Sequence, residues 1–147
     1  STAYDIFLSA YKNGSYSSPV AVDENFYSKG LDFNFFIDPL ERFIIYSSYK
    51  RDDDMGGGDL YISVKKNGKW QPALNLGTGI NSTSLDYSPF VSFDKKYFFF
   101  TSRRSTFKFP LKKPVSLDEI HKILNSHGNR SEDIYIMSAI FLDNDLK

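Results

Sequence analysis

Short runs of aromatic and β-branched residues, separated by turn residues, recur along most of the chain and predict β-strands. The runs at residues 43–46 and 97–100 are apolar at every position, which indicates strands buried on both faces between stacked sheets. Asn-Gly pairs at residues 13–14 and 67–68 predict hairpin turns, because a type I′ turn requires positive φ at both central residues. The predicted strands are residues 5–11, 16–22, 32–37, 42–48, 59–65, 70–76, 86–92, 96–102 and 133–139.

The predicted strands belong to a sequence repeat. Residues 5–16 (DIFLSAYKNGSY) align with residues 59–70 (DLYISVKKNGKW), an offset of 59 − 5 = 54. Residues 32–48 align with residues 86–102 at the same offset, 86 − 32 = 54, so that no gap intervenes. Each complete unit contributes four antiparallel strands, and repetition of such units is typical of β-propeller blades.

A third, partial copy begins at Asp133, after an interruption of the repeat. Asp133 follows Asp59 by 133 − 59 = 74 residues, which exceeds the period by 74 − 54 = 20. The extra residues lie within residues 105–132, and insertions in repeat proteins often map to the binding face. Asp5, Asp59 and Asp133 recur at one position of each copy, which favours a structural hydrogen bond to a neighbouring turn over a catalytic role.

The insertion carries the pattern of one short amphipathic helix. Ser116 is followed by Glu119 at the spacing of a capping box, and Gly128 is placed to end the helix, so that we expect a helix over residues 117–127. We expect its apolar stripe to pack on the side or the end of the β-structure, and the insertion to be the place for partner contacts. The stripe consists of Leu117, Ile120, Ile123 and Leu124.

Composition and charge narrow the possible functions. Lys and Arg together number 18, as do Asp and Glu, and the absence of a basic excess or stripe argues against nucleic-acid binding. The chain has no Cys, which excludes disulfides, thiolate zinc sites and cysteine nucleophiles. No apolar stretch has the length of a bilayer span. The sequence starts at Ser1 without a signal-peptide pattern, and we expect it to be part of a longer protein.

Three segments carry a family resemblance. Residues 86–104 (DYSPFVSFDKKYFFFTSRR) and 37–51 (IDPLERFIIYSSYKR) resemble the first half of the WD40-like repeat of TolB-type β-propellers. Residues 59–82 (DLYISVKKNGKWQPALNLGTGINS) resemble its second half, and the resemblance covers nearly the whole chain apart from the insertion. The Asp-Gly of the family's hairpin is replaced by Leu-Glu at residues 40–41 and by Asp-Lys at residues 94–95, which puts the turn type in doubt but not the fold.

The resemblance implies a fold and a role. The fold is all-β, with four-stranded antiparallel propeller blades: residues 1–30 end one blade, residues 31–82 form a full blade, and residues 83–147 form the last blade with its insertion. The predicted strands are too few to close a ring, so we expect an incomplete ring, completed by the remainder of the same propeller or by another chain. Family members are mostly bacterial and extracytoplasmic, in the periplasm or at the outer membrane, and act as non-catalytic protein-interaction or scaffold modules.

Three consecutive carboxylates, Asp52, Asp53 and Asp54, precede a run of glycines and are candidate oxygen ligands for Ca²⁺. The segment lacks the spacing and the closing Glu of an EF-hand. A solvated loop between strands is therefore the favoured interpretation, and we expect neither a metal site nor another cofactor.

Trp70 and Tyr16 occupy equivalent positions in two copies of the repeat. An exposed ring there could stack on a sugar, whereas repetition of the position favours packing between adjacent sheets. Sugar stacking is the basis of the alternative function, a carbohydrate-binding or glycan-processing propeller. Catalysis is not expected, because no pair of carboxylates is singled out and the sialidase-type Asp box (SxDxGxxW) is absent.

Overall fold

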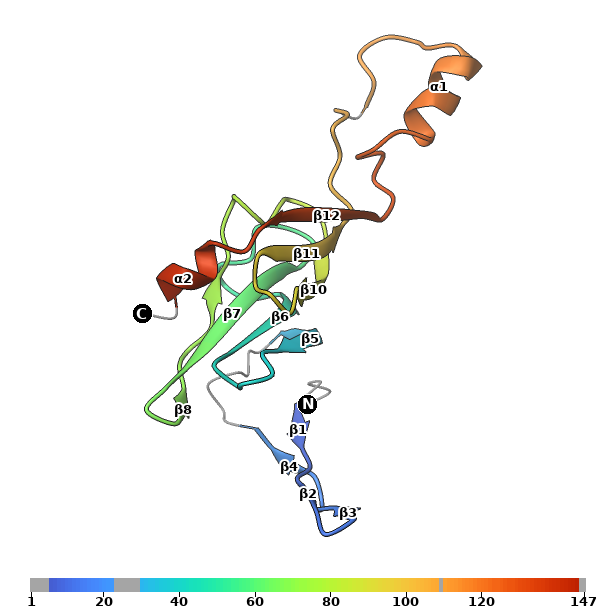
Figure 1. The fold of residues 1–147 in the computed structure, drawn as a ribbon. Helices are drawn as coiled ribbons and strands as arrows, with labels where there is room; N and C mark the ends of the chain where they lie inside the picture. Colours follow the sequence, from blue (N-terminus) through green and yellow to red (C-terminus); the bar gives the residue numbers. More distant parts are fainter. Residues whose placement is uncertain (1–5, 23–29, 109, 146–147) are drawn as a thin grey trace.

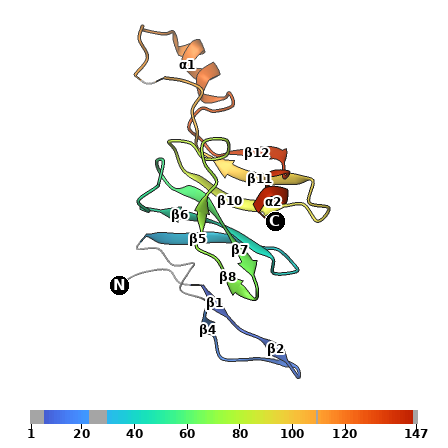
Figure 2. The same cartoon turned by 90° about the vertical axis from the view of Figure 1, so that its left-hand side faces the viewer.

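A computed structural model describes residues 6–22, 30–108 and 110–145 of the chain. The structure is mostly β, as the sequence predicted, and consists of antiparallel sheets, none of which closes on itself within the described residues. Sheets of five and three strands pack together at the centre, two short hairpin ladders lie at one end, and a helix projects from the other (Figures 1 and 2).

The five-stranded sheet corresponds to the complete copy of the repeat. Three of its strands pair in sequence order, and two short strands both pair with the third of them. The predicted fourth strand is split in two around Pro72, because proline has no backbone N–H to donate to a neighbouring strand. The strands are β5 (Leu31–Ile37), β6 (Phe43–Tyr49), β7 (Asp59–Lys66), β8 (Lys69–Trp70) and β9 (Leu74–Asn75).

The three-stranded sheet repeats this geometry with β10 (Asp86–Val91), β11 (Tyr97–Ser102) and β12 (Asp133–Ser138). The register of β10 with β11 equals that of β5 with β6 after a shift of 54 residues. Both pairs contain a β-bulge, at which Asn34 and Ser88 each have φ of 51°. The register of β11 with β12 likewise equals that of β6 with β7, so that Ser102 and Asp133 are directly paired on either side of the insertion.

The N-terminal hairpin ladders follow the same pattern. Their pairings equal those of β7 with β8 and β9 after a shift of 54 residues. Asn13 and Gly14 have φ of 54° and 83°, and Asn67 and Gly68 have φ of 52° and 76°, which confirms positive φ at both positions of each predicted turn. The predicted strand at residues 5–11 starts outside the described residues. The short strands are β1 (Phe7–Leu8), β2 (Tyr11–Lys12), β3 (Ser15–Tyr16) and β4 (Val20–Ala21).

β6 lies inside the stack and supplies side chains to two apolar clusters. Phe43 and Ile45 belong to the cluster shared with the three-stranded sheet. Ile44 and Tyr46 belong to a second cluster on the opposite face, which Ile6 of the N-terminal segment joins. The apolar run at residues 43–46 is therefore buried on both faces, as its pattern predicted.

Each of the two larger sheets contains a guanidinium that lies over aromatic rings and beside a buried Asp and Ser. Arg104 donates hydrogen bonds to Asp86 (2.9 Å) and Ser102 (2.8 Å), and its guanidinium carbon lies 4.6 Å from the centroid of the Tyr135 ring. The ion pair and the hydrogen bond compensate the buried carboxylate for lost hydration. The corresponding cluster of the five-stranded sheet consists of Asp32, Ser48, Arg51, Tyr46 and Tyr61.

A buried side-chain amide continues the five-stranded sheet beyond β9. Asn81 accepts a hydrogen bond from the backbone N–H of Leu60 (2.8 Å) and donates to the carbonyl of the same residue (2.9 Å). It also donates to the side-chain oxygen of Asn75 (2.8 Å). The amide thereby satisfies the buried N–H of Leu60 and gives the carbonyl of Leu60 a second donor besides the N–H of Leu76.

We expect Asn81→Ala to lower the free energy of unfolding by about 2–3 kcal/mol, because it leaves the buried N–H of Leu60 without a partner. Urea denaturation measures this change. Thr78→Ala is a matched control, since Thr78 is exposed in the same loop. Equal stability of the two variants would contradict the assignment.

Asp59 and Asp133 have the structural role that the repetition of this position predicted, and Asp5 lies outside the described residues. Asp59 accepts hydrogen bonds from the N–H of Met55 (2.9 Å) and the side chain of Asn75 (2.7 Å), and Asp133 accepts one from the N–H of Gly128 (2.7 Å). The other carboxyl oxygen of Asp59, Oδ1, is buried without a hydrogen-bond partner among the described residues. Burial raises the pKa of Asp59 above its ordinary value of 3.8.

A raised carboxyl pKa means that the folded state binds the proton more tightly than the unfolded state. The contribution of Asp59 to stability therefore falls as the pH rises from 3.8 through the higher pKa of the folded state. Asp59→Asn should remove this fall and make the free energy of unfolding less dependent on pH than in the wild type. Urea denaturation over a pH series tests this, with exposed Asp52→Asn as the control, and identical pH profiles of wild type and Asp59→Asn would refute it.

Candidate interaction surfaces

The two ends of the insertion between β11 and β12 pair with each other where they leave the sheet. Beyond the last pair of strand residues, Ser105 and Asn129 form an isolated antiparallel bridge. The N–H of Thr106 donates to the carbonyl of Gly128 (2.9 Å). Gly128 has φ of 64° and lies so close to Thr106 that an added Cβ would be 2.7 Å from its methyl group, so that only glycine fits there. The insertion is therefore anchored at its base.

The helix of the insertion is α1 (Leu117–Leu124), and its start is the one predicted. Ser116 and Glu119 form the reciprocal hydrogen bonds of a capping box, and these bonds hold the pKa of the Glu119 carboxyl below its ordinary value. The helix ends before Gly128, which corrects the predicted end. The reason is local: the side chain of Asn125 donates to the carbonyl of His121 (2.8 Å), and that of Ser126 donates to the carbonyl of Ile123 (2.8 Å).

The apolar stripe of α1 does not pack on the β-structure, contrary to our expectation. None of the residues of α1 is buried, and Leu117 and Leu124 are 75% and 56% exposed. Figures 1 and 2 show the helix held away from the sheets at the end of the inserted segment. Ile120 and Ile123 are half-buried within the insertion. Leu117 and Leu124 are therefore the residues of the stripe that another molecule can reach.

A second apolar surface covers the outer face of the three-stranded sheet. Phe98 and Phe100 of β11 point into the core, so that Tyr97 of the same strand points outward with Ile134 and Ile136 of β12. The predicted burial of residues 97–100 on both faces is thus correct for one face only, because none of the described sheets covers the other. The exposed fractions are 49% for Tyr97, 78% for Ile134 and 59% for Ile136, whereas the equivalent residues of the five-stranded sheet, Phe43, Leu60 and Ile62, are 0%, 0% and 2% exposed.

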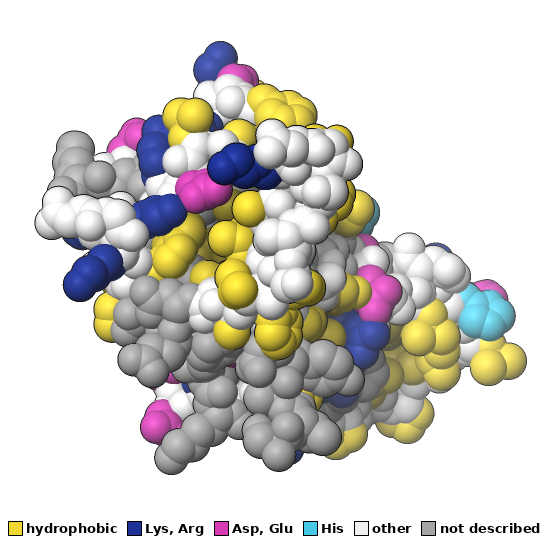
Figure 3. Space-filling view, turned by 90° about the horizontal axis from the view of Figure 1, so that it is seen from below, with side chains coloured by type: hydrophobic (Ala, Val, Ile, Leu, Met, Phe, Trp, Pro, Cys, Tyr) yellow, Lys and Arg dark blue, Asp and Glu magenta, His cyan; other side chains and the backbone are white. Residues whose placement is uncertain are grey.

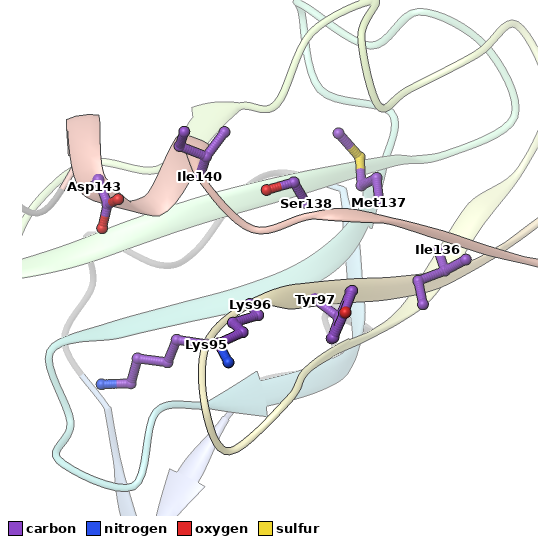
Figure 4. Close-up of a pocket in the computed structure, with 8 residues that line it drawn as sticks. All are labelled: Lys95, Lys96, Tyr97, Ile136, Met137, Ser138, Ile140 and Asp143. Atoms are coloured by element: carbon purple, nitrogen blue, oxygen red, sulfur yellow. The ribbon is translucent and has the colours of Figure 1, made fainter.

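An open pocket of about 600 Å³ lies at one end of this outer face. Figure 4 shows Lys95, Lys96 and Tyr97 at the start of β11, with Ile140 and Asp143 contributed by the chain after β12. The sequence did not reveal the helix there, α2 (Phe141–Asp145). Leu142 of this helix is buried in the core. On the face seen in Figure 3, hydrophobic side chains reach the surface among charged ones.

The two equivalent aromatic positions differ in their surroundings. Trp70 is half-buried against the second apolar cluster, and the ammonium of Lys65 lies 5.2 Å from its ring centroid. Tyr16 is 73% exposed, and its ring centroid lies 4.9 Å from that of Tyr11. Packing thus explains Trp70, whereas Tyr16 belongs to an exposed aromatic pair.

The acidic loop is organised by hydrogen bonds within itself and to the sheet. Asp53 accepts from the hydroxyl of Tyr61 (3.0 Å), and Asp54 accepts from the N–H groups of Lys50 (2.9 Å) and Gly56 (3.3 Å). Asp52 is exposed. Within the described part of the chain, no group of three or more His, Cys, Asp or Glu side chains is placed to hold a metal ion.

Comparisons of the chain with models of protein families, with curated proteins and with solved structures found no match. None of the helices that the structure describes has the length and apolarity needed to cross a bilayer.

The residues of the outer face were absent from the sequence-based candidates. The sequence nevertheless contains an indication of this surface. Tyr97, Ile134 and Ile136 are apolar residues at repeat positions that are buried only where another sheet packs against them. The repeat identifies these positions, but their exposure depends on whether another sheet packs against them.

The two sheets should respond differently to the same charge substitution. We expect Ile62→Asp to destabilise the fold by about 4 kcal/mol or more, since it buries an unpaired carboxylate, and the equivalent Ile136→Asp to change stability by less than about 1 kcal/mol. Thermal and urea unfolding of both variants measure the difference. Comparable losses would show that the outer face is covered in solution.

Proposed function

We propose that the chain is a segment of a β-propeller of WD40-like repeats and serves as a non-catalytic protein-interaction or scaffold module. The observation that carries this proposal is the exposure of Leu117 and Leu124 on the apolar stripe of α1, in an insertion whose base continues the pairing of β11 with β12. A helix with one apolar face is suited to lie in the hydrophobic groove of another protein. The family resemblance adds a bacterial extracytoplasmic location, in the periplasm or at the outer membrane, to the proposal.

Several observations support a binding role over chemistry. The buried carboxylates of Asp32, Asp38 and Asp86 each lie within 3.5 Å of an arginine nitrogen. The carboxylate of Asp59 accepts two hydrogen bonds that hold a loop. These acidic groups therefore have structural partners. The exposed Tyr11–Tyr16 pair is the one observation that favours the alternative, a carbohydrate-binding propeller, because paired rings can stack on a sugar.

The role of the helix can be tested by site-specific crosslinking. A photoreactive residue at Leu117 or Leu124 should give one discrete crosslinked species in the native cell, and a photoreactive residue at exposed Lys66 should not. The identified partner, once purified, should bind the chain with an affinity that Leu117→Asp reduces about tenfold or more, since the substitution removes an apolar contact and adds a charge. Unchanged affinity would overturn the proposal.

The chain supplies its own control for this test. Ser48 and Asp59 are joined by residues 49–58, whereas their equivalents Ser102 and Asp133 are joined by the longer residues 103–132. Replacing residues 103–132 by the sequence of residues 49–58 deletes the helix but retains an arginine for the buried cluster. We expect the melting temperature to stay within a few degrees and the crosslink and the binding to be lost. A folded replacement variant that still binds would place the site elsewhere.

A further inference from the structure

Within residues 6–22, 30–108 and 110–145, the outer edge of β12 has no strand paired with it. Antiparallel pairs alternate between hydrogen-bonded and non-hydrogen-bonded positions. The hydrogen bond from the N–H of Ala139 to the carbonyl of Lys96 (2.9 Å) fixes that alternation for β11 and β12. It directs the backbone N–H and C=O groups of Ile134, Ile136 and Ser138 away from β11. None of the strands that the structure describes pairs with this edge of β12.

The five-stranded sheet shows what occupies the equivalent edge. Leu60 of β7 and Ile134 of β12 occupy equivalent positions in the two sheets. Leu60 pairs with Ser47 of β6, and Ile134 pairs with Thr101 of β11, which is the residue equivalent to Ser47. The carbonyl of Leu60 accepts from the N–H of Leu76 (3.0 Å). Asn81 bonds both its N–H and its C=O, and β9 pairs with the adjacent residues of β7. An extended segment and an asparagine five residues beyond it therefore complete that edge.

We infer that the edge of β12 binds an extended segment of another polypeptide with the pattern of residues 71–82, QPALNLGTGINS, by strand addition. The segment pairs antiparallel with β12, and its asparagine bonds the backbone of Ile134 as Asn81 bonds that of Leu60. Three features carry the inference: the open edge, the matched register of the two sheets, and the apolar outer face that Ile134 and Ile136 present beside the edge. An unpaired edge is a template for such pairing.

This site deepens the proposed function and rests on it, since both treat the chain as a protein-binding module. It is nevertheless independent of α1. If no peptide binds the edge of β12, the crosslinking test of α1 still decides whether the helix binds a partner. If α1 binds no partner, the peptide test below still decides whether the edge of β12 binds a strand.

The test is a titration of the full chain into a fluorescently labelled synthetic peptide, QPALNLGTGINS. We expect saturable binding that the unlabelled peptide competes away. A peptide carrying Ala in place of the asparagine equivalent to Asn81 should bind about fivefold more weakly, the effect of losing hydrogen bonds to one backbone residue. In the chain, Ile136→Pro should weaken binding about tenfold, because it removes an edge N–H, whereas Ile136→Val should bind as the wild type does.

Hydrogen exchange keeps the inference testable even where Ile136→Pro fails to fold. On wild-type chain, the peptide should slow exchange of the amides of Ile134, Ile136 and Ser138, and leave unchanged those of Tyr135 and Met137, which already pair with β11. Absence of saturable binding, or protection that does not alternate along β12, would overturn the inference. Self-association of the chain that Ile136→Pro abolishes, without peptide binding, would assign the edge to a second copy and overturn it too.

Discussion

The structure depends on the packing of β6 and β7 between two layers. Alternate side chains of β6 enter opposite apolar clusters. Phe43 and Ile45 pack in the cluster shared with the three-stranded sheet, and Ile44 and Tyr46 pack in the cluster that the N-terminal segment joins. A strand that is apolar on both faces cannot lie at a surface without exposing one of them. The five-stranded sheet is therefore the element on which the N-terminal hairpins and the three-stranded sheet assemble. The three-stranded sheet has a covered inner face and an exposed apolar outer face, whereas every residue of the short strands β1–β4 is exposed.

Polar clusters fix the register that this packing requires. A slip of one residue along β11 would turn Phe98 and Phe100 outward. It would also separate Asp86 from Arg104, which now lies 2.9 Å away and over two aromatic rings. Because a buried carboxylate without a partner is costly, the cluster penalises the alternative register. The same arrangement around Arg51 fixes the register of the five-stranded sheet in the same way.

The repeat made much of the fold predictable. Periodicity located the strands, and the Asn-Gly turns and the capping box of α1 follow from local backbone chemistry that the sequence states directly. Local capping by Asn125 and Ser126 ended the helix early, and no periodic pattern contains that information. The position of α1 away from the sheets could not be predicted, because an amphipathic stripe indicates that a face is apolar but not what covers it. The exposure of the outer face of β12 could not be predicted either, since its residues have the pattern of a buried strand.

The inserted segment also has a consequence for the order of folding. The hairpin of β6 and β7 closes a loop of 59 − 48 − 1 = 10 residues, whereas that of β11 and β12 closes one of 133 − 102 − 1 = 30 residues. Tripling the loop adds about 1 kcal/mol to the entropic cost of closure. The paired strands of the five-stranded sheet also lie close together in the sequence. This sheet can therefore serve as the folding nucleus on which the other strands pack. β12 then docks last, and substitutions in it would speed unfolding rather than slow folding.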